Sequence, residues 1–168
     1  MGNKIRNSFV KQQITNALLQ LLEKRELTEI AIHEITTTAE VSRNSFYRNY
    51  TDKEDILHQY LKSMLSNWKE EWDSKNSDSN AELFGDLFAE LKSRAPLFLL
   101  LEKRNLFYLF RESYLELNAP PKDTDNMVAY TMSFVAGGVL GWIEEWIARG
   151  MQESAEVMSS LLSTHGMK

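Results

Sequence analysis

The segment of this chain that most constrains its fold reads ITTTAEVSRNSFYRNYTDK and runs from Ile35 to Lys53. Its spacing predicts a short helix, a tight turn and a second short helix. The apolar residues recur where they can share one small core, namely Ile35, Ala39, Val41, Phe46 and Tyr50. The polar and aromatic residues between them point outward, namely Arg43, Asn44, Ser45, Tyr47 and Asn49. An exposed set of this kind indicates a surface that binds a partner.

Apolar residues at helical spacing continue through almost the entire chain. Helices are predicted at approximately residues 9–24, 32–39, 43–49, 51–72, 82–91, 97–103, 106–117, 125–149 and 155–163. Ser42 and Ser154 are good N-caps for two of them, and Thr51 with Glu54 predicts a capping box at the start of a third. Gly150 is expected to end the helix at residues 125–149, and the polar stretch from Ser74 to Asn80 predicts a loop. No alternation of apolar and polar residues is long enough to predict a sheet. The expected fold is therefore all-α, with a helix-turn-helix domain at residues 1–53 and a helical domain at residues 54–168.

The composition suits a cytoplasmic protein with a real hydrophobic core. With 168 residues, 43% of them hydrophobic, the chain can bury a core in one or two small domains. It has no cysteine, which excludes disulfides and thiolate metal sites. The N-terminal residues MGNKIRNSFVKQQ contain no apolar run typical of a signal peptide. We therefore expect a cytoplasmic location.

Charge is distributed unevenly along the chain. Residues 1–53 contain eight Lys and Arg against six Asp and Glu, a balance of +2, so the total of −5 requires −7 in residues 54–168. Phosphate groups bind where positive charge gathers. Affinity for a nucleic acid is therefore expected in the N-terminal part.

The segment from Met127 to Ile143 has no charged residue. It is shorter than the roughly 20 residues needed to cross a bilayer, and three glycines dilute its apolar character. Gly137 and Gly141 lie four residues apart, on one face of a helix, where they let another helix come close. We therefore predict packing between subunits here and no membrane partner.

The string VSRNSFYRNYTDKEDIL, from Val41 to Leu57, resembles the TetR family of bacterial transcriptional regulators, together with Glu34, Ile35 and Ala39 before it. The resemblance covers approximately residues 8–58. It implies a three-helix DNA-binding domain and a helical domain for dimerisation and effector binding, with about nine helices in all. A homodimer places two helix-turn-helix units one helical turn apart, so the implied target is a palindromic operator in double-stranded DNA. The implied activity is transcriptional regulation, with repression as the first expectation.

The resemblance gives the second short helix of the motif its role on DNA. Arg43 and Asn44, at its start, are expected to reach base edges in the major groove, where Arg favours guanine and Asn favours adenine. Ser45 is expected to assist them. Lys4 and Arg6 precede the first predicted helix and are expected to follow the backbone or the minor groove as a short arm.

Phosphate contacts are expected from the residues that match the clamp of the family, namely Ser42, Tyr47, Asn49 and Lys53. Two residues depart from the family pattern. Ala31 stands where a threonine often caps the second helix, and Glu40 stands where glycine is usual in the turn. Both weaken the expected grip on DNA. The alternative is therefore a helical protein-interaction module that keeps the fold with weak or no DNA binding.

The C-terminal part is rich in aromatic side chains, most of which helical spacing assigns to a core. The resemblance implies a pocket there for a small-molecule or protein effector. The candidates for its lining are Trp68, Trp72, Phe88, Phe107, Tyr130 and Phe134. The last two long helices are implied to form a four-helix dimer interface, for which the candidates are Gly137, Gly141 and Trp142.

An enzyme is the weakest of the readings that we compare. The sequence offers no Ser/His/Asp set, no pair of catalytic carboxylates and no glycine-rich phosphate loop. His33 and His58 stand alone, without neighbouring residues at metal-ligand spacing. We therefore expect no catalytic residues, no metal and no cofactor.

Overall fold

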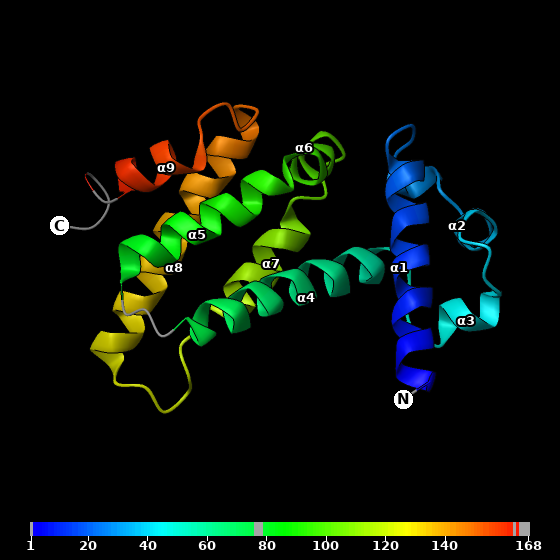
Figure 1. Cartoon of the computed structure of the whole chain (residues 1–168), viewed down its shortest axis with the longest axis horizontal. Helices are drawn as coiled ribbons and strands as arrows, with labels where there is room; N and C mark the ends of the chain where they lie inside the picture. Colours follow the sequence, from blue (N-terminus) through cyan, green and yellow to red (C-terminus); the bar gives the residue numbers. More distant parts are fainter. Residues whose placement is uncertain (1, 76–78, 163, 165–168) are drawn as a thin grey trace. The chain divides into compact units, whose positions relative to one another are not determined.

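The computed structural model describes residues 2–75, 79–162 and 164. Within these residues the chain forms nine α-helices, one short 3-10 helix and no strand (Figure 1). The all-α expectation is confirmed. The chain divides into two compact units, and the division falls inside helix α4, between Leu61 and Lys62.

The N-terminal unit is a small helical bundle that contains α1 (Gly2–Leu22), η1 (Leu27–Glu29), α2 (Ile32–Thr38), α3 (Arg43–Tyr47) and the start of α4 (Lys53–Ser74). Helix α2 packs on α1, and α3 follows α2 after a tight turn (Figure 1). Large apolar side chains from every α-helix fill its centre. They include Ile14, Leu18, Leu22, Ile35, Phe46, Ile56 and Leu57.

Polar side chains cap the first turns of α3 and α4. Ser42 Oγ accepts the backbone N–H of Ser45 at 3.1 Å, as the sequence predicts. At α4 the cap is Asp52, one residue after the predicted Thr51. Asp52 Oδ1 accepts the N–H of Asp55 at 2.8 Å, and Asp55 Oδ2 accepts the N–H of Thr51 at 2.9 Å. A carboxylate accepts a backbone N–H more strongly than a hydroxyl does. Asp52, and not the Thr51 hydroxyl, therefore caps α4.

Helix α1 begins at Gly2, well before the predicted start at residue 9. Residues 6–9 near its start are all exposed, including Arg6 and Phe9. A helix without a buried stripe carries no periodic signal in its sequence. Lys4 and Arg6 therefore lie within α1, and the prediction of an arm before the first helix is wrong.

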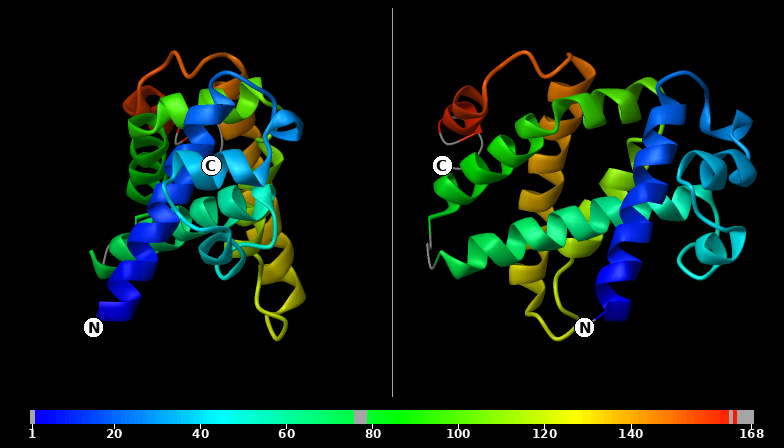
Figure 2. Two further views of the ribbon diagram at one scale, coloured as in Figure 1. Left: turned by 90° about the vertical axis from the view of Figure 1, so that its right-hand side faces the viewer. Right: turned by 45° about the vertical axis from the view of Figure 1, so that its right-hand side comes forward.

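The C-terminal unit contains the rest of α4 and five further helices. Helix α9 lies along α5, and α8 packs against α6 and α7 (Figure 2). Edge-on aromatic pairs hold this core together. The ring centroids of Phe88 and Trp146 lie 5.6 Å apart, and those of Phe98 and Phe110 lie 5.1 Å apart. The five helices are α5 (Asn80–Ser93), α6 (Ala95–Lys103), α7 (Tyr108–Leu117), α8 (Asn126–Ala148) and α9 (Ala155–Leu161).

Helix α8 is the one helix of the described residues that is long and apolar enough to cross a membrane, judged by length and composition alone. One of its faces is buried in the C-terminal unit, including Ile143 and Trp146. Gly150 follows the helix with φ +83°, in the position that the sequence predicts. Two other predictions lie partly outside the described residues: the loop from Ser74 to Asn80, at residues 76–78, and the last helix, at Ser163.

The turn between α2 and α3 contains a non-glycine residue in the left-handed region, Glu40 at φ +53°. The N–H of Val41 donates to the carbonyl of Thr36 at 3.0 Å and closes the end of α2 over this turn. A side chain at such a φ costs about 1–2 kcal/mol, because Cβ approaches the carbonyl oxygen. The turn therefore places a non-glycine residue in the conformation that glycine adopts most easily.

We expect Glu40→Gly to be more stable than Glu40→Ala by about 0.5–1 kcal/mol, because glycine adopts this φ without a clash. The greater freedom of glycine in the unfolded chain offsets part of the gain. Both variants remove the carboxylate, so their difference isolates the backbone term. Urea unfolding followed by circular dichroism measures it. An alanine variant as stable as the glycine variant would show that Glu40 is not strained.

Candidate nucleic-acid interface

Helix α3 has one buried face and one exposed face. Phe46 is fully buried, and its ring lies 5.9 Å from that of Tyr50 and 5.3 Å from that of Tyr47, between centroids. Tyr47 nevertheless keeps 60% of its surface exposed. Arg43 and Asn44 are exposed on the first turn. The base-reading candidates of the sequence therefore lie on a surface that the core holds in place.

Three of the DNA-binding candidates, Ser42, Ser45 and Asn49, also form hydrogen bonds in or beside α3. The hydroxyls of Ser42 and Ser45 lie 3.0 Å apart at the start of the helix. The amide nitrogen of Asn49 donates to the carbonyl of Ser45 at 2.8 Å, and Asn49 is half-buried. Ser42 Oγ also accepts the N–H of Ser45, so Ser42 and Asn49 each satisfy a backbone group of this five-residue helix. Any contact that these side chains make with phosphate is additional to that structural role.

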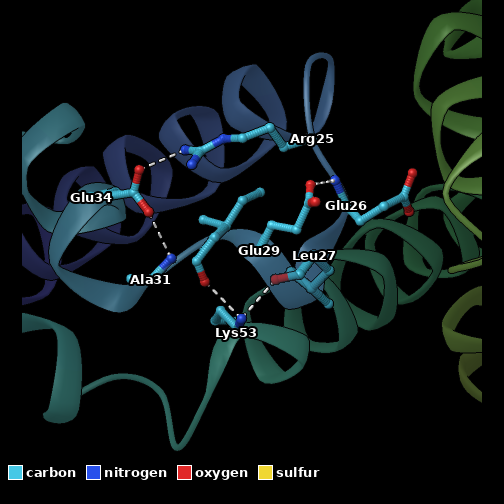
Figure 3. A network of polar contacts seen from close by, with 8 residues as sticks. Arg25, Glu26, Leu27, Glu29, Ala31, Glu34 and Lys53 are labelled. Carbon is cyan, nitrogen blue, oxygen red and sulfur yellow. Dashed lines mark hydrogen bonds and ion pairs between the residues drawn. The ribbon is translucent and has the colours of Figure 1, made fainter.

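Lys53, the first residue of α4, ties that helix to the segment before α2 (Figure 3). Its Nζ donates to the carbonyls of Leu27 and Ile30, each at 2.6 Å. The ammonium has three N–H donors, so one remains for a further acceptor. The expected phosphate contact of Lys53 stays a prediction, and the structure adds a second role that the sequence did not reveal.

Glu34 replaces the missing side-chain cap at the start of α2. Ala31 is the N-cap of this helix and has no side-chain acceptor. The carboxylate of Glu34 accepts the N–H of Ala31 at 2.9 Å and pairs with Arg25 at 2.7 Å (Figure 3). The Ala31 N–H, and after it the Arg25 guanidinium, lower the pKa of Glu34. Because the pKa of Glu34 is lower in the folded state, these interactions stabilise the fold fully above the ordinary carboxyl pKa. Their contribution to stability is lost as the pH falls through the lowered value.

The six effector candidates do not gather in one place. Four of them are buried side chains of the C-terminal unit, namely Trp68, Trp72, Phe88 and Phe107. Trp68 is held by a 3.0 Å hydrogen bond from Nε1 to Asp86. The other two, Tyr130 and Phe134, are exposed on α8.

A cavity of about 390 Å³ lies elsewhere in the C-terminal unit, and none of the six candidates lines it. Its walls come from α4, α5, α7, the residues after α7, and α8, and they are mainly apolar. Tyr114 is the large polar side chain of the lining, and burial raises the pKa of its hydroxyl to about 12. No sequence signal marked the cavity, because its lining residues follow the same helical spacing as the core. They are Lys69, Leu83, Phe84, Tyr114, Leu117, Asn118, Ala119, Thr131, Met132, Val135 and Ala136.

The outer face of α8 is apolar and open. A Cβ built on Gly137 or Gly141 would meet no atom within 4 Å. Trp142 beside them is half-buried. The large apolar side chains exposed on this helix are Met127, Val128, Tyr130, Met132 and Phe134.

Residues 103–165 match the family model of a transcriptional regulator C-terminal region, TetR_C_8. This match supports a transcriptional regulator of the TetR family. The matched residues all lie in the C-terminal unit, whereas the string from Val41 to Leu57 lies in the N-terminal unit. A search of curated proteins gave no match.

We expect Lys53→Met to lower the free energy of unfolding by about 1–3 kcal/mol, because two carbonyls lose a charged donor. Lys24→Met is the matched control, since it removes the same charge from an exposed residue near the end of α1. Urea unfolding of the full chain measures both variants. Equal losses in the two variants would contradict a structural role of Lys53.

Proposed function

We propose that this TetR-family regulator binds a palindromic operator in double-stranded DNA as a homodimer, represses transcription there, and responds to an effector in its C-terminal unit. The observation that carries the proposal is the exposed face of α3. It presents Arg43, Asn44 and Tyr47 on a helix that the buried Phe46 holds in place. A rigid helix with a guanidinium and an amide at its start matches the chemistry of base edges in the major groove.

The open face of α8 supports the homodimer. Met127, Tyr130, Phe134, Gly137 and Gly141 recur every three or four residues, so they share one side of the helix. Apolar surface of this extent is typical of an interface in a soluble protein. The two glycines leave room for the backbone of another helix, and a second copy supplies the same surface by two-fold symmetry. We therefore assign this face to a partner subunit in the cytoplasm and not to lipid.

The cavity of about 390 Å³ supports the effector response. Its size lies within the range of small-molecule sites, and its mostly apolar walls carry a few polar groups. Helix α4 contributes Lys69 to the lining and Lys53 to the N-terminal unit. An effector that binds one arrangement of α4 better than another would change the spacing of the two α3 helices in the dimer.

The DNA proposal is tested by fluorescence anisotropy with a labelled duplex from the region upstream of the chain's own gene. We expect Arg43→Ala to cost about 1–3 kcal/mol of binding free energy and to relax the base preference, because a bidentate base contact is lost. Tyr47→Ala is expected to weaken binding to all sequences. Lys24→Ala, an exposed residue near the end of α1, serves as the control and should bind like wild type. Undetectable or salt-independent binding would instead favour the protein-interaction module.

The dimer is tested by replacing Phe134, which is 77% exposed, with glutamate. A charge at the centre of an apolar interface is costly, so we expect Phe134→Glu to be monomeric at micromolar concentration. Leu115→Glu is the control, because Leu115 is 39% exposed on α7 and lies outside the proposed interface. Analytical ultracentrifugation distinguishes the two states. A monomeric wild type, or a dimeric Phe134→Glu, would contradict this interface.

A further inference from the structure

Two arginines, Arg6 and Arg48, lie together where α1 meets α3. Arg48 takes part in none of the contacts proposed above, and Arg6 was expected on an arm before the first helix but lies within α1. Arg6 comes from the first turns of α1, and Arg48 directly follows the last residue of α3. Both line one cavity of about 210 Å³. The complete lining is Arg6, Asn7, Val10, Ser45, Arg48 and Asn49. It contains two cations and no acidic side chain.

The guanidinium groups of this cavity have donors to spare. Arg48 donates from Nε to the carbonyl of Asn44 at 3.3 Å, which leaves its terminal N–H groups available. Arg6 is exposed and forms no ion pair or hydrogen bond with another described side chain. A guanidinium carries five N–H donors in a planar fork that matches the oxygens of a phosphate. The cavity is therefore rich in donors and has no carboxylate in its lining.

The nearby lysines are already engaged. Lys11, one turn after Arg6 on α1, donates to Gln59 at 2.8 Å and lies 5.6 Å from the ring centroid of Tyr50. Lys53 uses two of its donors on backbone carbonyls. Arg6 and Arg48, by contrast, keep most of their guanidinium N–H donors available for a further acceptor.

We propose that Arg6 and Arg48 together hold one backbone phosphate of duplex DNA. The inference rests on the proposed DNA binding and moves the main phosphate contact from the clamp around Lys53 to the junction of α1 and α3. Ser45, in α3, and Asn49, two residues after its end, line the same cavity, which therefore adjoins the helix that we propose reads the bases. A phosphate held here fixes the register of α3 along the groove without reading sequence.

The test compares Arg6→Gln, Arg48→Gln and the double variant with wild type, using the full chain and a random-sequence duplex at several salt concentrations. The slope of log association constant against log salt counts the phosphates that are neutralised, at about 0.9 per phosphate. If the arginines share one phosphate, the double variant loses about 0.9 of slope per protomer. Each single variant weakens binding, and the two effects are less than additive. Lys24→Gln, at the other end of α1, controls for loss of charge and should leave the slope unchanged.

Four outcomes overturn the proposal. An unchanged slope in the double variant shows that these arginines do not touch DNA, while wild-type binding still supports the proposed function. A loss of about 1.8 per protomer shows two separate phosphates. A wild type without salt-dependent binding rejects the proposed function and this site with it. The fourth outcome is a free-anion site. In that case, inorganic phosphate at constant ionic strength would raise the melting temperature of wild type but not of the double variant. The salt dependence of DNA binding would be the same in both proteins.

Discussion

The burial of Phe46 and Tyr50 is the constraint on which the rest of the N-terminal unit depends. A five-residue helix has too few internal hydrogen bonds to be stable alone, so α3 needs tertiary contacts to exist. Burial raises the pKa of the Tyr50 hydroxyl, and a hydrogen bond with Thr15 opposes that rise. The same ring lies beneath Lys11, which binds Gln59. Gln59 belongs to α4, and its side-chain amide donates to the carbonyl of Asn49, just after α3, at 3.0 Å. These contacts therefore join α1, α3 and α4.

Periodic burial explains why the fold was predictable and where prediction stopped. The helices with an apolar stripe were found from spacing, and Ser42 was identified as a cap because its side chain acts within its own turn. The bonds of Lys53 were not predictable, because its acceptors lie in η1 and directly after it, more than twenty residues away. A short 3-10 helix has no periodic pattern, and a contact over that distance depends on the completed fold. The cap of α4 was misplaced by one residue, because Thr51 and Asp52 are both good acceptors.

The C-terminal unit shows a different limit of sequence reasoning. Large aromatic residues were the natural candidates for an effector pocket, yet Phe88 and Phe107 are core residues, and Phe134 faces outward. Size and apolar character are what a core, a pocket and an interface have in common. Only the packing separates them. The cavity is instead lined in part by smaller residues such as Ala136 and Thr131, together with Tyr114.

A net charge of −5 is compatible with the proposed DNA binding, because several acids of the N-terminal unit are occupied by hydrogen bonds within the protein whereas the arginines near α3 are not. The carboxylate of Glu34 is occupied by Arg25 and a backbone N–H, that of Glu29 by the N–H of Glu26, and that of Asp52 by the N–H of Asp55. Each of these acids stabilises the start of a helix, where negative charge is favourable. The arginines at and beside α3 have no carboxylate partner among the described residues. Positive charge therefore remains available on the surface that presents α3. This local charge, and not the net charge of the chain, decides the affinity for phosphate.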